Sequence, residues 1–276
     1  MKQIEVSKLE QFISWVKDIN AEFGNHKHLF FRGHSKTEYK LIPSVFRKND
    51  KVEYNEREVL LDFERYSPVH KINYSFIDEI DKVLVDIRHY GLPTRLLDWT
   101  LAPLNALFFA CSENENNDAH VIAFNVWEYW KKIVREENHQ HKEIHKIHII
   151  ARSLLAKKWN FETIKEHIEK KFSYSYLQPE DIEHPFPFIA NYTNDRVLHQ
   201  RGCFTIHGKC HAPIDSIQNI DSFLRRVLIK AEFKKAILYE LHLMYINHYS
   251  IYPDFEGMSK VIRRYGSLFT IKNPNT

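Results

Sequence analysis

The chain has 276 residues, of which 43% are hydrophobic, 14% aromatic and 27% charged, and its net charge is +3. This composition is typical of a globular protein with a buried core, and the near balance of 39 basic and 36 acidic residues gives no strong signal of nucleic-acid binding. Only 7 glycines are present, and neither common glycine-rich nucleotide loop, G-x-G-x-x-G or G-x-x-x-x-G-K, occurs.

The cysteines and the apolar patterning indicate a cytoplasmic protein. Cys111, Cys203 and Cys210 are odd in number and lack C-x-x-C spacing, which favours reduced thiols over a disulfide framework. Residues 1–9 carry charges and no apolar run, so they do not resemble a secretory signal. No stretch approaches the roughly 20 apolar residues that cross a bilayer, and we therefore expect no membrane contact.

Helical and extended patterns alternate through the first 112 residues. Apolar residues recur at helical spacing over 9–23, after a capping box at Ser7 and Glu10. The short apolar run over 28–33 predicts a buried strand that ends at Arg32. Further patterns predict helices over 56–66, 78–90 and 101–112, the last capped by Thr100, and an extended or turning segment over 94–99.

The second half continues in the same mixed manner. Residues 119–126 predict a strand and residues 127–137 a helix, whereas the Lys-, Glu- and His-rich residues 138–175 predict an insert of exposed helices. Later patterns predict strands over 186–190, 203–207 and 227–233 and helices over 195–199, 234–247 and 255–264. We therefore expect an α+β fold, with helices packed around a modest mixed sheet, in a single domain over residues 1–276.

Arg32 is the strongest individual candidate for a functional residue. A guanidinium at the end of an apolar strand must be paired or must face a ligand, because a buried unpaired charge is costly. Its planar fork matches a carboxylate or a phosphate. A salt bridge to Asp98 explains the pattern equally well, and both roles are compatible if Asp98 orients Arg32 toward a ligand.

The segment from His89 to Thr100 is the densest polar cluster, and a glycine and a proline predict a turn within it. We expect His89 to act as a base or as a donor to phosphate. Trp99 or Tyr90 is suited to stacking on a base or a nicotinamide ring. The alternative is a structural corner, in which Asp98 caps the next helix and Trp99 belongs to the core.

Two histidine patterns hint at a metal site, but both have simpler explanations. His141, His145 and His148 share one helical face in an exposed, charged stretch, which favours a solvated surface. The H-x-x-C-H run over 207–211 has no second paired motif, which favours packing at a strand end. The sequence therefore predicts no bound metal.

Three blocks of the sequence resemble the motif blocks of the FRG domain family. They are Phe31-Arg32-Gly33, residues 91–100 with the helix that follows over 103–110, and Gln200-Arg201-Gly202-Cys203-Phe204. The run over 252–257 resembles the C-terminal block of the family. The blocks follow the family's order and spacing over residues 28–262, and their most specific part is the Leu-Pro-Thr-Arg-Leu-Leu-Asp-Trp run over 92–99. FRG domains occur in bacteria, phage and mobile elements.

The first block is also similar to the strand-borne Tyr-Arg-Gly of arginine-type ADP-ribosyltransferases. This resemblance implies an ADP-ribosyltransferase-like fold with NAD as co-substrate, Arg32 as the clamp on its diphosphate, and Thr94 or Thr100 in the hydroxyl role. The third block has Gln200 but no E-x-E or Q-x-E, so the glutamate expected in such enzymes is missing. Another acid or base, His89 or Asp98, would have to replace it.

These observations predict one cleft with two overlapping sets of residues. The expected catalytic residues are Arg32, His89, Thr94, Asp98 and Gln200. The expected cofactor-binding residues are Phe31, Arg32, Gly33, Tyr90, Arg95, Trp99 and Thr100.

The function that the resemblance implies is that of an NAD-using ADP-ribosyltransferase-like effector or toxin in conflict between bacteria and phage. Its acceptor would be a protein or a nucleic acid. The alternative is a non-catalytic module that binds a nucleotide, a phosphorylated ligand or a nucleic acid. A phosphodiesterase or nuclease would need metal-binding carboxylates, and Asp98, Asp195 and Asp254 are too scattered in the sequence to assemble such a site.

Overall fold

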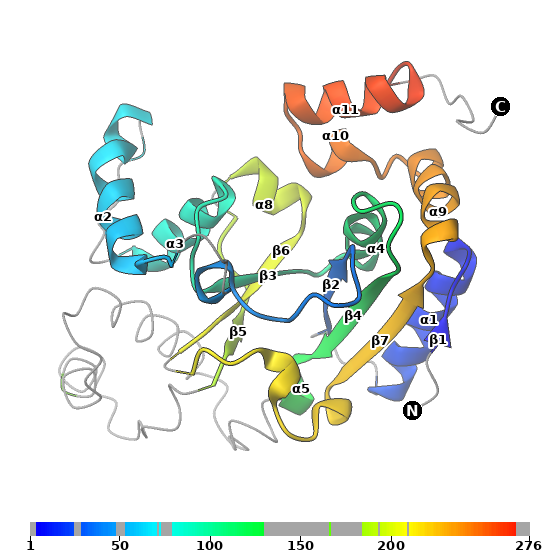
Figure 1. Cartoon of the computed structure of the whole chain (residues 1–276), viewed down its shortest axis with the longest axis horizontal. Helices are drawn as coiled ribbons and strands as arrows, with labels where there is room; N and C mark the ends of the chain where they lie inside the picture. Colours follow the sequence, from blue (N-terminus) through cyan, green and yellow to red (C-terminus); the bar gives the residue numbers. More distant parts are fainter. Residues whose placement is uncertain are drawn as a thin grey trace.

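A seven-stranded mixed sheet forms the centre of the protein (Figure 1). The computed structural model describes residues 4–24, 29–47, 53–70, 79–129, 184–192, 194–208 and 210–268, with the single positions 72 and 166. The strands are β1 (Ile4–Glu5), β2 (Leu29–His34), β3 (Leu96–Thr100), β4 (Ala119–Asn125), β5 (Phe186–Phe188), β6 (Gly202–Ile206) and β7 (Leu224–Ile229). Their order is β1-β7-β4-β2-β3-β6-β5, and only the β1–β7 pair is parallel.

Helices pack on this sheet and confirm the expected α+β class. They are α1 (Leu9–Glu22), α2 (Glu56–Tyr66), α3 (Ile80–His89), α4 (Pro103–Cys111), α5 (Val126–Tyr129), α8 (Asp195–His199), α9 (Ala231–Leu243), α10 (His248–Ile251) and α11 (Phe255–Tyr265). One apolar core joins α1, α4 and α9 to β2, β4 and β7, and a second joins α2 and α3 to β3, β5 and β6. Figure 1 shows α2 and α3 to the left of the sheet, α1 and α9 to its right, and α4 over its middle.

Four details of the predicted elements were wrong. Strand β2 does not end at Arg32, because its pairing with β4 continues to His34↔His120. The capping box at Ser7 and Glu10 does not form: the Ser7 backbone N–H donates to Gln11 Oε1 at 2.8 Å, and Lys8 is the N-cap of α1. Thr100 lies in β3, and the N-cap of α4 is Ala102.

The predicted strand over 227–233 ends early. Strand β7 stops at Ile229, and α9 begins at Ala231. Asp118 explains the change, because its carboxylate accepts a hydrogen bond from the Ala231 N–H at 3.0 Å and pairs with Lys230 at 2.8 Å. The predicted insert over 138–175 lies outside the described residues apart from Glu166, as does the end of the predicted helix over 127–137.

The sheet opens between its central strand, β2, and the neighbouring strand β3. Strands β2 and β4 pair continuously from Leu29↔Asn125 to His34↔His120, whereas β2 and β3 share the single register pair Phe31↔Thr100. Beyond that pair the two strands diverge. Arg32 on β2 and Asp98 on β3 therefore flank an opening in the sheet instead of joining a continuous ladder.

Gly33 lets a helix close one side of this opening. A Cβ at Gly33 would lie 1.9 Å from the Ala106 carbonyl oxygen and 2.6 Å from the Ala110 nitrogen, both in α4. No side chain fits there, so the glycine that follows Arg32 is required for the close packing of α4 on β2.

Candidate anion-binding site

A cleft of about 1770 Å³ lies where β2 and β3 diverge. The residues after β2, helices α2, α3 and α8 and the Tyr252 region also line it. Of the residues expected in the site, the cleft brings together Phe31, Arg32, Gly33, His89, Arg95, Asp98, Trp99, Thr100 and Gln200. Thr94 and Tyr90 are not among its lining residues: Thr94 is 1% exposed, and Tyr90 packs against Phe63 on the protein surface.

Asp98 holds two arginines from different elements. Arg88, in the last turn of α3, donates through Nε to both carboxylate oxygens at 2.8 and 3.0 Å, and its Nη2 lies 2.7 Å from Oδ2. Arg32 Nη1 donates to the backbone carbonyl of Asp98 and lies 3.7 Å from its carboxylate. Burial alone would raise the pKa of Asp98, but Arg88 and Arg32 outweigh it and lower the pKa below its usual range.

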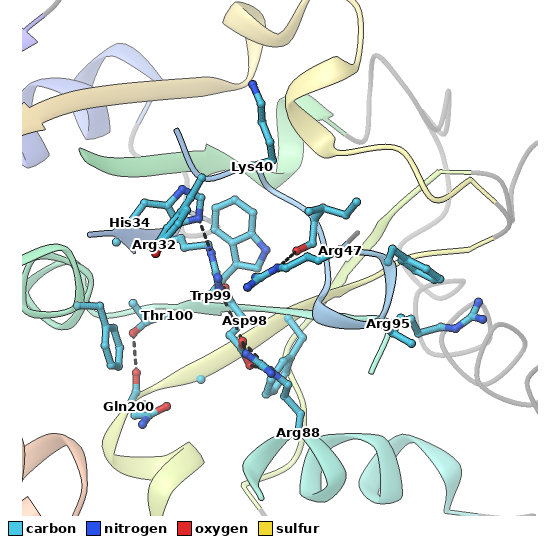
Figure 2. A pocket seen from close by; sticks show the side chains of 18 of the residues that line it. Arg32, His34, Lys40, Arg47, Arg88, Arg95, Asp98, Trp99, Thr100 and Gln200 are labelled. Atoms are coloured by element: carbon cyan, nitrogen blue, oxygen red, sulfur yellow. Dashed lines mark hydrogen bonds and ion pairs between the residues drawn. The ribbon is translucent and has the colours of Figure 1, made fainter. Parts of the chain in front are cut away.

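A third guanidinium joins this pair from the loop after β2. Figure 2 shows Arg32, Arg47 and Arg88 converging on the Asp98 region, with Arg47 held by the Ile42 carbonyl at 3.1 Å. Burial lowers the pKa of Arg32 to about 10, and desolvation inside the cleft together with Arg88 lowers the pKa of Arg47. Three cations with one carboxylate between them leave an excess of positive charge, and this arrangement favours an anionic ligand.

Arg32 is fixed on two sides and open on the third. Its Nε donates to His34 Nε2 at 2.9 Å, and its Nη1 donates to the Asp98 carbonyl. Its Nη2 has no acceptor among the described residues. Only 15% of the side chain is exposed, so this remaining donor is available mainly to a ligand inside the cleft.

His89 and Arg196 form another part of the lining. Arg196 Nη1 donates to the His89 carbonyl at 3.0 Å, and its guanidinium lies over the Tyr252 ring at 4.6 Å. His89 Nδ1 is buried without a hydrogen-bond partner among the described residues. Burial and the neighbouring Arg196 lower the pKa of His89, so its imidazole is neutral near pH 7 and able to accept a proton.

Two lining residues, Arg95 and Trp99, use their polar groups to bind other parts of the protein. Arg95 is 4% exposed and pairs through Nε and Nη2 with Glu56 at 2.6–3.1 Å, while its Nη1 donates to the carbonyls of His207 and Gly208. Trp99 is 3% exposed and donates through Nε1 to Thr205 Oγ1 at 3.1 Å.

The hydroxyls of Thr100 and Thr94 form hydrogen bonds with backbone groups. Thr100 Oγ1 donates to the Gln200 carbonyl at 2.6 Å and accepts from the Ala102 N–H at 3.0 Å. Thr94 Oγ1 accepts from the Leu96 N–H at 3.3 Å. A transfer reaction that used the Thr100 hydroxyl would have to break its bond to the Gln200 carbonyl, and Thr94 lies outside the cleft lining.

A buried lysine shapes the rim of the cleft. Lys234 in α9 is fully buried, and its Nζ donates to the carbonyls of Ser35, Glu113 and Asn114 at 2.7–3.1 Å. Ser35 and Glu113 line the cleft and come from different parts of the chain. The ammonium therefore ties together two loops that have no backbone ladder between them.

Residues 27–119 match the family model of the FRG domain. The chain contains an FRG domain. A search of curated proteins and a search of solved structures each gave no match. The matched part of the FRG domain holds Arg32, Arg47, Arg88 and Asp98, whereas Gln200, Arg196 and Tyr252 come from outside it.

Sequence reasoning missed several residues of the FRG domain cleft. Arg88 lies one position before the predicted segment from His89 to Thr100, within the predicted helix over 78–90, and the local pattern does not show that this helix docks beside Asp98. His34 lies two positions after Arg32 and therefore on the same face of β2. His120 carries no local signal, because only the β2–β4 register brings it to His34.

Cys203 lies outside the cleft lining. Cys203 is fully buried, and burial raises the pKa of its thiol well above the usual range. Among the described residues, no group of three or more His, Cys, Asp or Glu side chains is placed to hold a metal ion. His141, His145 and His148 lie outside those residues. Across the part of the chain that the structure describes, no helix has the length and apolar character needed to cross a bilayer.

Proposed function

We propose that the cleft binds a nucleotide through its phosphate groups, with NAD as co-substrate, and that the protein transfers or hydrolyses the ADP-ribosyl group. The observation that carries this proposal is the set of three guanidiniums around the single carboxylate of Asp98. Guanidinium forks match phosphate oxygens, and the low exposure of the Arg32 side chain, 15%, strengthens such a contact. Their net charge of about two positive units suits a diphosphate that carries two negative charges.

The lining residues fit such a ligand at two points. Arg32 Nη2 is a donor without an acceptor among the described residues, and Arg47 and Arg88 supply further donors in the same cleft. His89, in another part of the lining, has a buried and unpartnered ring nitrogen. Phe109 and Tyr252 also line the cleft and offer apolar ring surface to a base or to nicotinamide.

NAD supplies an ADP-ribosyl group whose bond to nicotinamide breaks with the bonding electrons leaving on nicotinamide. His89 Nδ1 accepts the proton that the attacking hydroxyl, amine or water loses. The products are then nicotinamide, a proton and either an ADP-ribosylated acceptor or free ADP-ribose. Arg32, Arg47 and Arg88 hold the diphosphate during this step and keep the sugar in place.

Asp98 is poorly suited to the role of the missing glutamate. Its carboxylate already accepts from Arg88 at 2.8 and 3.0 Å and lies beside Arg32, and these cations stabilise its charge. This observation favours a second candidate function, a module that binds a nucleotide or phosphorylated ligand without chemistry. The wider role as an effector or toxin in conflict between bacteria and phage belongs to the catalytic proposal alone.

The test is incubation of the purified protein with cell lysate and NAD labelled in its adenylate part. Wild type, Arg32→Ala and Arg65→Ala are compared, because Arg65 lies on the surface of α2, 67% exposed and outside the cleft lining. Label on protein or nucleic acid that disappears with Arg32→Ala and persists with Arg65→Ala supports the transferase. Release of nicotinamide without transfer indicates an NAD hydrolase.

Binding data separate the remaining outcomes. Absence of turnover together with Arg32-dependent binding of ADP-ribose would favour the non-catalytic module. Absence of both turnover and binding, in a protein shown to be folded, would reject the proposal and its alternative.

A further inference from the structure

Two histidines on neighbouring strands lie directly behind Arg32. His34 on β2 and His120 on β4 are register partners, and they are 3% and 9% exposed. His34 Nδ1 lies 3.1 Å from His120 Nε2, and His34 Nε2 lies 2.9 Å from Arg32 Nε. Arg32 and His34 share a face of β2 because side chains two positions apart on a strand point the same way. The three side chains form one continuous chain of contacts.

The donors in this chain determine where its protons are. An arginine Nε is always a donor, so His34 Nε2 must be the acceptor. The single proton of a neutral His34 is then on Nδ1, which donates to His120 Nε2. The proton of His120 is in turn on its own Nδ1. Both rings are therefore neutral, each with its Nε2 as an acceptor.

We infer that His34 is a positioning residue that, with His120 behind it, holds the Arg32 guanidinium in the one orientation that presents Nη2 to an anion in the cleft. This inference rests on the proposed phosphate-binding role of Arg32. A guanidinium held only at Nη1 by the Asp98 carbonyl is able to rotate about that contact. The second anchor, at Nε, removes this freedom before any ligand binds, so less entropy is lost on binding.

The charges around the pair favour its neutral form. His34 faces Arg32, His120, Arg47 and Arg226, and the Tyr39 ring lies edge-on to it at 5.9 Å. Burial and the three arginines lower the pKa of His34 to about 2, and burial and Arg226 lower the pKa of His120 to about 4. The largest causes of both shifts all lower the pKa, so the acceptor at His34 Nε2 is preserved through the neutral pH range.

Two substitutions at one position separate positioning from packing. The side-chain amide of glutamine reaches the place of the Nε2 atom of histidine, whereas that of asparagine reaches only the place of Nδ1. His34→Gln therefore keeps an acceptor for Arg32 Nε, and His34→Asn removes it while keeping a polar group toward His120. We expect His34→Asn to weaken the binding of inorganic phosphate by about tenfold and His34→Gln to bind nearly as wild type does.

A second readout observes Arg32 without any ligand. In protein labelled with ¹⁵N-arginine, the Arg32 Nε–H signal, assigned by its loss in Arg32→Lys, should exchange slowly with water in wild type and His34→Gln. It should exchange fast in His34→Asn. Long-range ¹H–¹⁵N couplings on the unsubstituted protein should show the Nδ1–H form for both histidines, and this measurement needs no variant to fold.

The outcomes distinguish the inference from the function on which it rests. Equal losses of phosphate binding for His34→Asn in the wild-type and Arg32→Lys backgrounds would overturn the inference, because a positioning residue acts only through Arg32. An Nε2–H form of His34, or an Nε–H signal indifferent to His34→Asn, would overturn it as well. The expected NMR results in a protein that binds no phosphate would leave the positioning in place and reject the proposed function.

Discussion

Replacing Asp98 with asparagine should weaken the fold and strengthen anion binding at the same time. The substitution keeps the size of the side chain but removes the charge that Arg32 and Arg88 share. Three guanidiniums then lie in one cleft with no carboxylate between them. The fold becomes less stable because the three guanidiniums repel one another. A bound anion restores part of the lost stability, because its negative charge takes the place of the carboxylate.

The structure sets the size of both effects. Removing one partner of a fully buried ion pair costs about 3–5 kcal/mol, but the Asp98 side chain is 36% exposed, so solvent screening reduces the expected loss to about 1–3 kcal/mol. A carboxylate roughly 6 Å from a bound phosphate repels it by about 3 kcal/mol at an effective dielectric constant of about 20. Salt screening lowers this repulsion to about 1–2 kcal/mol, which corresponds to phosphate binding about tenfold tighter in Asp98→Asn.

Urea denaturation in chloride and in phosphate buffer, matched in ionic strength, measures both quantities. Asp118→Asn is the control, because it changes the net charge equally and breaks the Lys230 ion pair outside the cleft. Phosphate should stabilise Asp98→Asn more than wild type and should stabilise Asp118→Asn as it does wild type. Phosphate binding that is unchanged or weaker in Asp98→Asn would refute the reasoning that Asp98 is the countercharge of an anion site.

Three further predictions concern the scaffold of the site. Gly33→Ala should lower the free energy of unfolding by more than about 3 kcal/mol, because its Cβ would lie 1.9 Å from the backbone of α4. The control Gly91→Ala has open space around its Cβ but a φ of +81°, and it should cost about 1–2 kcal/mol. Equal losses for the two variants in urea denaturation would argue against the close packing of α4 on β2. Arg95→Met should cost about 3–5 kcal/mol because it leaves Glu56, 10% exposed, without its cation; a loss as small as that of Arg65→Met would show that the pair does not support the fold. The free energy of unfolding should fall as the pH drops below about 6.5, because His34 and His120 take up protons in the unfolded chain but stay unprotonated in the native protein, where their pKa values are about 2 and about 4. Each histidine contributes roughly 1.4 kcal/mol per pH unit, so the free energy of unfolding measured between about pH 6.5 and 5 should change less steeply with pH in His34→Gln. An identical slope in wild type and His34→Gln would contradict the assignment.

Local sequence patterns predicted most of the elements that carry the site. Helix α2 was predicted with its observed bounds, and the predicted helices over 78–90 and 101–112 correspond to α3 and α4 within a few residues. These predictions were correct because amphipathic periodicity and turn residues are local signals that a short stretch of sequence contains in full. Arg32 stood out for a related reason, since a charge beside an apolar strand requires a partner wherever that strand lies.

The sequence by itself predicted Arg32, His89 and Asp98 as members of one cleft, and these residues line the same cleft in the structure. Only the tertiary structure decided how they work together. The divergence of β2 from β3 opens the cleft, the docking of α3 brings Arg88 to Asp98, and the β2–β4 register brings His120 to His34 across 86 positions of chain. Periodicity encodes which face of an element is buried, but it does not encode which element lies next to it. The pairing of distant charges and rings therefore depends on the packing of the whole sheet.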